Sequence, residues 1–200
     1  MMKLNLLVVN TIVLLSLCFP VLAFSSQMDV SSLFKAWSQV ERAEKGFTEE
    51  QFDPLLEISQ HKSGVMRYRA PDFLEQHYKM PFDGKITFSE NIVKIDFPNR
   101  KLELSVENSP EITLFSRTFL NILNGKLALI KKDFKLVFLA QENSHWKLRL
   151  IPINQIKSQI QEVLLMGDKT EIQSILFTQV SGDWRKLSLQ ALPTNPTLLK

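Results

Sequence analysis

Alternation of apolar and polar residues recurs along most of this sequence and limits the folds that the chain can adopt. In a β-strand, successive side chains point to opposite faces, so a period of two is typical of a strand with one buried face. About ten to eleven such runs, bounded by turn-forming residues, follow one another at intervals of about 8–12 residues. The predicted strands occupy residues 47–52, 64–70, 73–78, 85–88, 92–97, 102–106, 134–140, 145–152, 160–166, 172–180 and 184–191. So many short strands joined by tight turns favour a mainly β (α+β) fold, in which one antiparallel sheet curls towards a barrel.

Two segments change to the spacing of an amphipathic helix. The first spans residues 28–40, and either Ser31 or Ser32 is placed to cap its N-terminus. The second begins at Pro110 and ends at the Asn124-Gly125 pair, because such residues favour helix starts and stops. The apolar faces are formed by Leu33, Phe34, Trp37 and Val40 in the first helix and by Ile112, Phe115, Phe119, Ile122 and Leu123 in the second. We expect two or three helices to pack over the mouth or concave side of the sheet.

Size and charge restrict the class of protein. The chain has 200 residues, 44% of them hydrophobic, so one domain with a sizeable core is expected. Its 24 basic and 21 acidic residues leave a net charge of +3, which is too small and too dispersed to indicate nucleic acid as a partner. With only 6 glycines, a glycine-rich phosphate-binding loop is not expected.

The first 23 residues have the three-part pattern of a secretory signal peptide. A basic start at Lys3 precedes an apolar run over residues 4–17, and Pro20 breaks that run before the small residue Ala23. An uncleaved membrane anchor is the alternative, but the run is short for a bilayer core about 30 Å thick. We therefore expect export to the periplasm, with cleavage after Ala23.

The single cysteine, Cys18, lies within this segment. Lipoprotein signals place a small residue directly before the lipidated cysteine, whereas here Leu17 precedes it, so lipidation is not favoured. Cleavage after residue 23 leaves a chain without cysteine, which needs no disulfide in an oxidising compartment. The expected organisation is a signal peptide over 1–23, one domain over 24–192 and a flexible tail over 193–200.

Patterns of catalytic or metal-binding residues are missing from the sequence. His61, His77 and His145 are far apart and have no metal-ligand spacing, and no GxSxG elbow for a serine nucleophile occurs. Glu49 and Glu50 point to opposite faces of a predicted strand, so we interpret the pair as solvated surface. His77 is likewise interpreted as facing solvent. We therefore predict that the protein is not an enzyme and uses no metal or cofactor.

The apolar residues of the second and third predicted strands gather on one face. By strand parity this face carries Met66, Tyr68, Ala70, Leu74, Gln76 and Tyr78, and the opposite face carries Arg67, Arg69, Glu75 and His77. A curved sheet with helices over its mouth can enclose an apolar pocket that suits a long hydrocarbon ligand. The alternative, which the pattern alone favours, is that these residues fill an ordinary core.

Two motifs and their order point to a known family. After the exported signal and a helix come Phe47-Thr-Glu-Glu-Gln-Phe52 and then Gly64-Val-Met-Arg-Tyr-Arg-Ala-Pro71-Asp72. This order resembles the LolA family of periplasmic carriers of outer-membrane lipoproteins. Residues 68–77 and 146–152 look like a LolA-related branch, whose members are thought to work beside exporters of other lipids. The resemblance covers about residues 30–190.

The resemblance implies both a fold and a function. The family fold is an unclosed antiparallel β-barrel with a helical lid over an apolar cavity. The implied lid residues are Leu33, Phe34, Trp37, Phe115 and Phe119, and the implied cavity lining is Met66, Tyr68, Ala70, Leu74, Gln76 and Tyr78. The implied function is that of a monomeric carrier, which accepts an acylated lipoprotein or another lipid from an inner-membrane exporter and delivers it to an outer-membrane acceptor.

One departure from the family pattern concerns the client and the lid. The family carries an arginine directly before the proline of the second motif, thought to hold the lid, and here that position is Ala70. A free lipid or glycolipid therefore becomes a more plausible client. A second hypothesis is a non-carrier periplasmic subunit with a filled barrel, which docks on an inner-membrane lipid exporter through Arg67, Arg69, Glu75 and His77.

Overall fold

The computed structural model describes residues 29–89, 91–105, 110–140, 143–154 and 159–192. The expected signal peptide (1–23) and C-terminal tail (193–200) lie outside the described residues. A helix that could span a membrane is not found in the described part of the chain.

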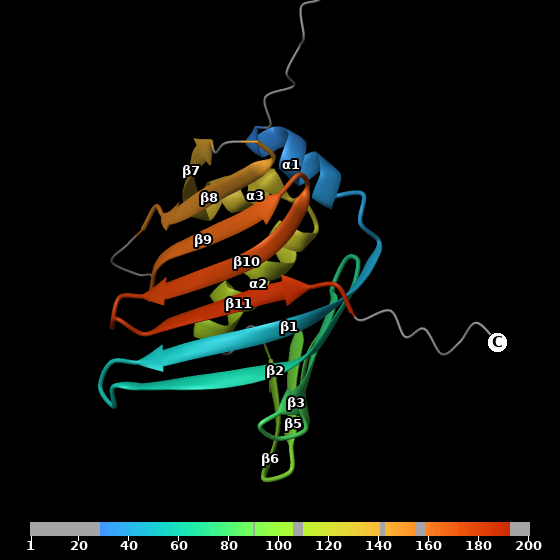
Figure 1. The fold of residues 1–200 in the computed structure, drawn as a ribbon, viewed down its shortest axis with the longest axis vertical. Coiled ribbons are helices and arrows are strands. Elements are labelled where there is room, and N and C mark those ends of the chain that lie inside the picture. The colour runs from blue at the N-terminus through green and yellow to red at the C-terminus, as the bar shows by residue number, and fades with distance from the viewer. Residues whose placement is uncertain (1–28, 90, 106–109, 141–142, 155–158, 193–200) are drawn as a thin grey trace, which may run out of the picture.

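The described residues form one antiparallel sheet of eleven strands, shown in Figure 1. The strands are β1 Arg42–Asp53, β2 Ile58–Arg69, β3 Phe73–Met80, β4 Gly84–Ser89, β5 Ile92–Phe97, β6 Arg100–Ser105, β7 Phe134–Ala140, β8 His145–Pro152, β9 Ile160–Asp168, β10 Glu171–Gln179 and β11 Trp184–Gln190. Their order in the sheet is β6-β5-β4-β3-β2-β1-β11-β10-β9-β8-β7. The edge strands β6 and β7 do not pair with each other, so the curled sheet stays unclosed, as the resemblance implied.

Pairing of β1 with β11 joins the two halves of the chain at the middle of the sheet. Phe47 of β1 lies opposite Leu189 of β11 on one side and opposite Gly64 of β2 on the other. All the remaining pairs of neighbouring strands are consecutive in the chain, so nearly all of the sheet is built from simple hairpins. This explains why runs of alternating residues with tight turns were sufficient to predict it.

The β1–β2 hairpin is longer than the sequence predicted. The alternation indicated strands only over 47–52 and 64–70, whereas both strands have 12 residues. In the added part of β2, polar residues lie opposite polar residues of β1, for example Lys62 opposite Glu49 and Gln60 opposite Gln51. Because Gln60 and Lys62 stand where an apolar residue would mark the buried face, hydrophobic periodicity could not reveal this part.

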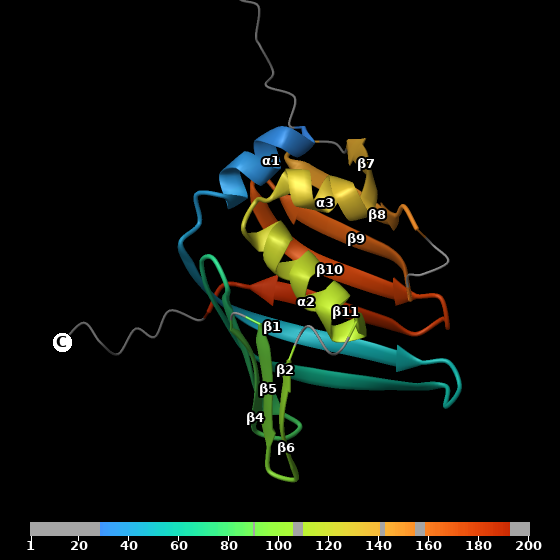
Figure 2. The same ribbon diagram turned by 180° about the vertical axis from the view of Figure 1, so that it is seen from behind.

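Three helices are described, and all lie on the concave side of the sheet. They are α1 Val30–Trp37, α2 Pro110–Leu123 and α3 Leu127–Asp133. Figure 2 shows α2 running diagonally across the concave face of β9, β10 and β11, with α1 and α3 near one end of it. We call these three helices the lid. The sequence predicted two of them by position and left the third unplaced.

The cap of α1 differs from the prediction. Asp29, not Ser31 or Ser32, is the N-cap residue, and its Oδ1 accepts a hydrogen bond of 2.8 Å from the Ser32 amide. The Ser32 hydroxyl accepts a bond of 3.1 Å from the Asp29 amide in return. This reciprocal arrangement is a capping box, which satisfies two amides that the helix itself leaves without partners.

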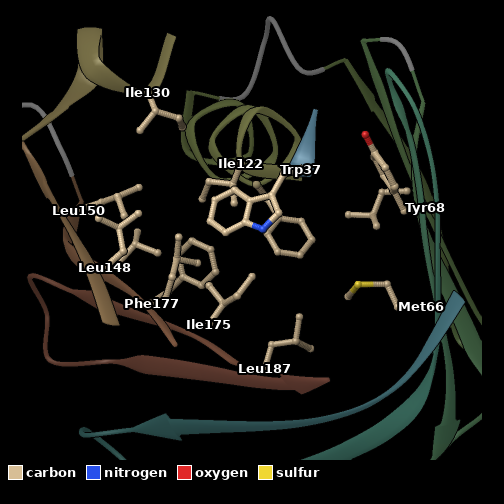
Figure 3. Packing of buried hydrophobic residues seen from close by; sticks show 14 of the residues in the cluster. Trp37, Met66, Tyr68, Ile122, Ile130, Leu148, Leu150, Ile175, Phe177 and Leu187 are labelled. Carbon is tan, nitrogen blue, oxygen red and sulfur yellow. The ribbon is translucent and has the colours of Figure 1, made fainter. Parts of the chain in front are cut away.

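The hydrophobic core fills the space between the lid and the concave face of the sheet. Figure 3 shows Trp37 and Ile122 of the lid facing Ile175, Phe177 and Leu187 of the C-terminal strands. The largest fully buried side chains come from the lid and from both halves of the sheet and include Trp146, Phe34, Phe47, Phe134, Leu33 and Leu74. Much of the interior is therefore filled with side chains, and free space is confined to parts of it.

Candidate functional site

Strand register places five of the six predicted lining residues on one face of the sheet, and Ala70 directly follows β2. Tyr68 lies opposite Leu74, Met66 opposite Gln76, and directly paired residues share a face. Met66, Tyr68, Leu74, Gln76 and Tyr78 are buried and Ala70 is half-buried. Figure 3 shows Met66 and Tyr68 pointing from β2 into the interior, towards Trp37. The predicted parity of β2 and β3 therefore agrees with the structure, and whether these residues bind a lipid stays a prediction.

A cavity of about 330 Å³ lies between the lid and the start of the β1–β2 hairpin. Its volume falls in the range of about 300–1,000 Å³ that is typical of small-molecule sites. Most of its lining is apolar: Ala36, Trp37, Val40, Ala43, Met66, Tyr68, Leu123, Ile172 and Leu189. Lys45, Thr170 and Glu171 complete the lining, and the Lys45 and Glu171 side chains form an ion pair of 3.1 Å. We call this space the lid cavity.

The predicted lining residues divide among different places in the interior. Met66 and Tyr68 line the lid cavity, whereas Ala70, Leu74 and Gln76 do not. Leu74 is 1% exposed and belongs to the packed core. Tyr78 lines a different cavity, described below. Strand parity could predict the face of each residue, but not how far along the strand the filled core gives way to open space.

Trp37 anchors α1 to the C-terminal half of the sheet. Its indole Nε1 donates a hydrogen bond of 2.8 Å to the Thr170 carbonyl in the β9–β10 turn. Its ring packs against Trp146 of β8, with centroids 5.7 Å apart, and against Phe34 of its own helix at 4.8 Å. Trp37 thus forms one wall of the lid cavity and also attaches this part of the lid.

Asn124 attaches the end of α2 to the N-terminal half of the sheet. Its Nδ2 donates a hydrogen bond of 2.6 Å to the Pro71 carbonyl, and its Oδ1 accepts one of 3.0 Å from the Tyr68 hydroxyl. Both partners flank Ala70, the position where the family pattern has an arginine. The sequence marked Asn124 only as a helix stop, because nothing local to it predicts contacts with residues more than fifty positions away.

The other predicted lid residues are buried where the structure describes them. Leu33, Phe34 and Phe119 are each no more than 2% exposed. The Phe119 ring packs against Phe177 of β10, with centroids 6.5 Å apart. The side chain of Phe115 lies outside the described residues.

A charged cluster on the concave face was missed by the sequence analysis. Glu49 is 2% exposed, which makes the prediction of solvated surface wrong for this residue. Its Oε2 accepts hydrogen bonds from Arg185 Nη2 at 2.5 Å and from the Tyr78 hydroxyl at 3.0 Å. Its Oε1 lies 3.4 Å from Lys62 Nζ. Strand parity offered the signal, since Glu49 shares the face of the buried Phe47 two positions before it.

Electrostatics keep this cluster charged. Burial by itself would raise the pKa of Glu49, but Arg185, Lys62 and the Tyr78 hydroxyl stabilise the carboxylate and hold its pKa below the ordinary value. Burial also raises the pKa of Tyr78 well above its usual range, so its hydroxyl stays protonated and donates. The cluster is therefore a buried ion pair supported by a neutral phenol.

The four residues predicted for the convex face lie there and contact neighbouring side chains. Arg67 forms ion pairs with Glu44 at 2.9 Å and with Glu75 at 2.8 Å. Arg69 lies 4.8 Å above the centroid of the Phe73 ring. His77 was predicted to face solvent; its side chain is 14% exposed, and its Nε2 is 3.1 Å from Asp83 Oδ1.

Comparisons with known proteins place this fold in a family. A family described as outer membrane lipoprotein carrier protein LolA-like matches residues 23–195. A comparison with curated protein sequences finds no match. Among solved structures, a LolA superfamily protein from Nitrosomonas europaea is 11% identical, with 84% of this chain and 96% of that chain covered and a TM-score of 0.40.

Two further solved structures match this chain. A putative outer membrane lipoprotein-sorting protein domain from Vibrio parahaemolyticus is 13% identical, covers 84% of this chain and 92% of that chain, and has a TM-score of 0.43. A DUF1329 family protein from Desulfovibrio piger is 8% identical, with 84% of this chain and 92% of that chain covered and a TM-score of 0.46. At such identities the assignment depends on the family match, which spans the whole sheet and its lid. By that match, this chain belongs to the family described as outer membrane lipoprotein carrier protein LolA-like.

Proposed function

We propose that this protein is a periplasmic carrier, which binds the acyl chains of a lipoprotein or another lipid in the lid cavity. It takes this client from an inner-membrane exporter and delivers it to an outer-membrane acceptor. The observation that carries the proposal is the lid cavity itself, about 330 Å³ of mainly apolar space between the lid and the sheet. Burial of hydrocarbon is worth about 0.8 kcal/mol per methylene, so even part of an acyl chain would be held usefully.

The construction of the lid supports the same proposal. The lid is attached to the sheet on both sides of the cavity, through Trp37 on one side and Asn124 on the other. Each attachment is a small number of hydrogen bonds, worth about 0.5–1.5 kcal/mol apiece, beside the packing of Leu33, Phe34 and Phe119 into the core. Loss of these few bonds would loosen the lid at the cavity while the core packing keeps it on the sheet. A carrier needs such a balance, because it must shield its client in water and also release it.

The proposal is tested by native mass spectrometry of the protein purified from the periplasm, followed by organic extraction. We expect a co-purified lipid or acylated peptide, and its headgroup identifies the client. A clean mass of the protein alone, without uptake of an added fluorescent fatty acid, would contradict the carrier function. That outcome would favour the accessory subunit that docks on a lipid exporter.

A matched pair of variants connects this binding to the lid cavity. Leu189 lines the cavity and is only partly buried, so Leu189→Glu places a carboxylate there with little loss of core packing. We expect it to weaken fatty-acid binding about ten-fold or more, since a charge facing a bound hydrocarbon must be desolvated. Leu139→Glu is the control, because Leu139 on edge strand β7 is 38% exposed and lies outside this cavity's lining. Equal binding by the two variants would place the ligand elsewhere.

A further inference from the structure

A second cavity, of about 410 Å³, lies farther along the concave face of the sheet. It shares no lining residue with the lid cavity. One part of its lining is the charged cluster of Glu49, Lys62, Tyr78 and Arg185, and Arg100 of β6 joins them. We call this space the cationic cavity.

The cationic cavity also has an apolar wall. Ile86 of β4 and Ile95 of β5 lie directly opposite each other in the register, and Phe97 follows Ile95 on the same face two positions later. All three line the cavity. The Phe97 ring packs against Tyr78, with centroids 5.6 Å apart. The space is therefore amphipathic, with charge on one part of its lining and hydrocarbon on another.

Positive charge exceeds negative charge in this lining. Among the described residues that line the cavity, Lys62, Arg100 and Arg185 are cationic and Glu49 is the one carboxylate, an excess of two positive charges. Glu49 is already engaged by both Arg185 and Lys62. The Arg185 and Lys62 side chains keep 26% and 28% of their surface exposed, so a ligand in the cavity can reach them. Such an excess in a partly desolvated site favours an anion.

Tyr78 separates this site from the packed core. Its ring meets Phe47 edge-on, with centroids 5.2 Å apart, and is 2% exposed, while its hydroxyl accepts a hydrogen bond of 3.0 Å from Arg185 Nη2. The phenol therefore fixes the position of the guanidinium beside the cavity. The charged groups are held in place before any ligand arrives, which reduces the entropy lost on binding.

We propose that the cationic cavity binds the anionic headgroup of an amphiphilic lipid, a phosphate or a carboxylate, with only the part of the hydrocarbon next to the headgroup lying against Ile86, Ile95 and Phe97. This inference rests on the proposed carrier function and names the class of client that the carrier prefers. Guanidinium and ammonium groups form charge-assisted hydrogen bonds to either anion. An uncharged lipid would gain nothing from the positive charge of the lining and would bind less well.

The test compares headgroups on one hydrocarbon chain. Hexadecyl phosphate, palmitate, hexadecanol and hexadecylamine are titrated into the delipidated protein, below the concentration at which each forms micelles, by isothermal calorimetry. We expect the two anions to bind about ten-fold more tightly than hexadecanol, the factor that one charge-assisted hydrogen bond provides. Hexadecylamine should bind most weakly. Inorganic phosphate, titrated as a competitor, should displace hexadecyl phosphate only at far higher concentration, because it lacks the chain.

Variants connect the preference to this site. The double variant Lys62→Gln/Arg100→Gln should bind hexadecanol as the wild-type protein does. It should lose the preference of about ten-fold for the two anions over hexadecanol. Arg42→Gln is the matched control. Arg42 is exposed and lines neither cavity, because it lies on the face of β1 opposite to Ala43, which lines the lid cavity. Circular dichroism and thermal unfolding check that each variant is folded. Arg100→Gln alone, at an exposed position, should show part of the loss even if the double variant is unstable.

The outcomes separate this inference from the carrier function. If hexadecanol and hexadecyl phosphate bind equally well, or the double variant loses affinity for all four ligands alike, the headgroup site is overturned and the carrier function stands. If inorganic phosphate competes as well as hexadecyl phosphate, the site binds a free anion, and the proposal of an amphiphilic ligand is overturned. If none of the four chains binds, both proposals fail together.

Discussion

Glu49 is a carboxylate on the inner side of a curved sheet, and its neighbours decide whether the protein can tolerate it there. A buried charge without partners is strongly unfavourable, and one that is paired and hydrogen-bonded is tolerated. Here Arg185, Lys62 and Tyr78 together satisfy both carboxylate oxygens. Three different strands supply these partners, so the cluster also fixes β1 against β2, β3 and β11 at one point.

Replacing Glu49 should therefore destabilise the fold. Glu49→Gln leaves the Arg185 guanidinium without its counter-charge, and we expect a loss of about 2–3 kcal/mol in the free energy of unfolding. This loss is smaller than the cost of breaking a fully buried ion pair, which is about 3–5 kcal/mol, because Arg185 keeps 26% of its side chain exposed. Urea unfolding at neutral pH measures the difference. Glu50→Gln, on the opposite face of the same strand, is the control and should change stability by less than about 0.5 kcal/mol.

The same pair predicts how stability changes with pH. The pKa of Glu49 is lowered on folding from its ordinary value of 4.5, so the ion pair contributes fully above that pH. Its contribution is lost as the pH falls through the folded-state pKa. The gap in unfolding free energy between the wild-type protein and Glu49→Gln should therefore narrow in acid. A gap that is constant from neutral pH down to about pH 3 would show that Glu49 is not paired in the folded state.

Among the helices, the close approach of α1 to the turn between α2 and α3 depends on one glycine. Gly125 has a φ of +64°, and a Cβ at this position would overlap the Phe34 carbonyl oxygen and the Ser38 amide. Glycine is thus required both for the left-handed backbone and for the contact with the end of α1. Gly125→Ala should lower the melting temperature, since the left-handed conformation alone disfavours alanine by about 1–2 kcal/mol and the overlap adds to this.

Gly182→Ala is the comparison variant for this prediction. Gly182 has a φ of +92°, but a Cβ there would meet only Pro54 at 3.5 Å, so its variant should lose the backbone part alone.

Attachment of α2 to the β2–β3 turn should govern how fast a ligand enters and leaves. Asn124→Ala removes the hydrogen bonds to Pro71 and Tyr68 that hold the lid on that side. We expect faster dissociation of a bound fluorescent fatty acid, by about ten-fold, with a smaller change in equilibrium affinity, because the lid cavity lining is intact. Stopped-flow displacement measures this rate. Asn121→Ala on the same helix is the control, and an equal acceleration by both variants would contradict a specific role for Asn124.

Local patterns predicted the elements of this fold better than they predicted its site. Hairpins between neighbouring strands depend on alternation and turns, which are local, and eleven strands followed from them. Glu49 and Arg185 meet only because β1 pairs with β11 across 136 positions, and no local pattern encodes that pairing. The short helix α3 was not placed either, because its seven residues are too few to show a clear period. Strand parity could still have placed Glu49 on the inner face, had it been applied to β1 as it was to β2.

For the molecule as a whole, the curled sheet separates two chemically different surfaces. The concave side carries the lid, the core and both cavities. On the convex side, charged residues pair mainly with one another across neighbouring strands, as Arg67 does with Glu44 and Glu75. Because side chains alternate along each strand, a substitution on one surface leaves the other surface intact. The proposed binding of a client and the proposed recognition by membrane partners can therefore be altered independently.

This separation gives a test of how the two surfaces divide the work. The double variant Arg67→Glu/Arg69→Glu reverses two charges on the convex face, and it places a carboxylate at position 67 beside Glu44 and Glu75. Since the Arg67 side chain is 45% exposed, solvent screens the repulsion and stability should fall by no more than about 1 kcal/mol. Fatty-acid affinity measured by calorimetry should stay within about two-fold of the wild-type value, because no convex residue lines either cavity. If lipid transport in cells is lost while binding is kept, the convex face recognises a membrane partner. If binding itself is lost, the two surfaces are coupled through the sheet and the independence argued from strand alternation is wrong.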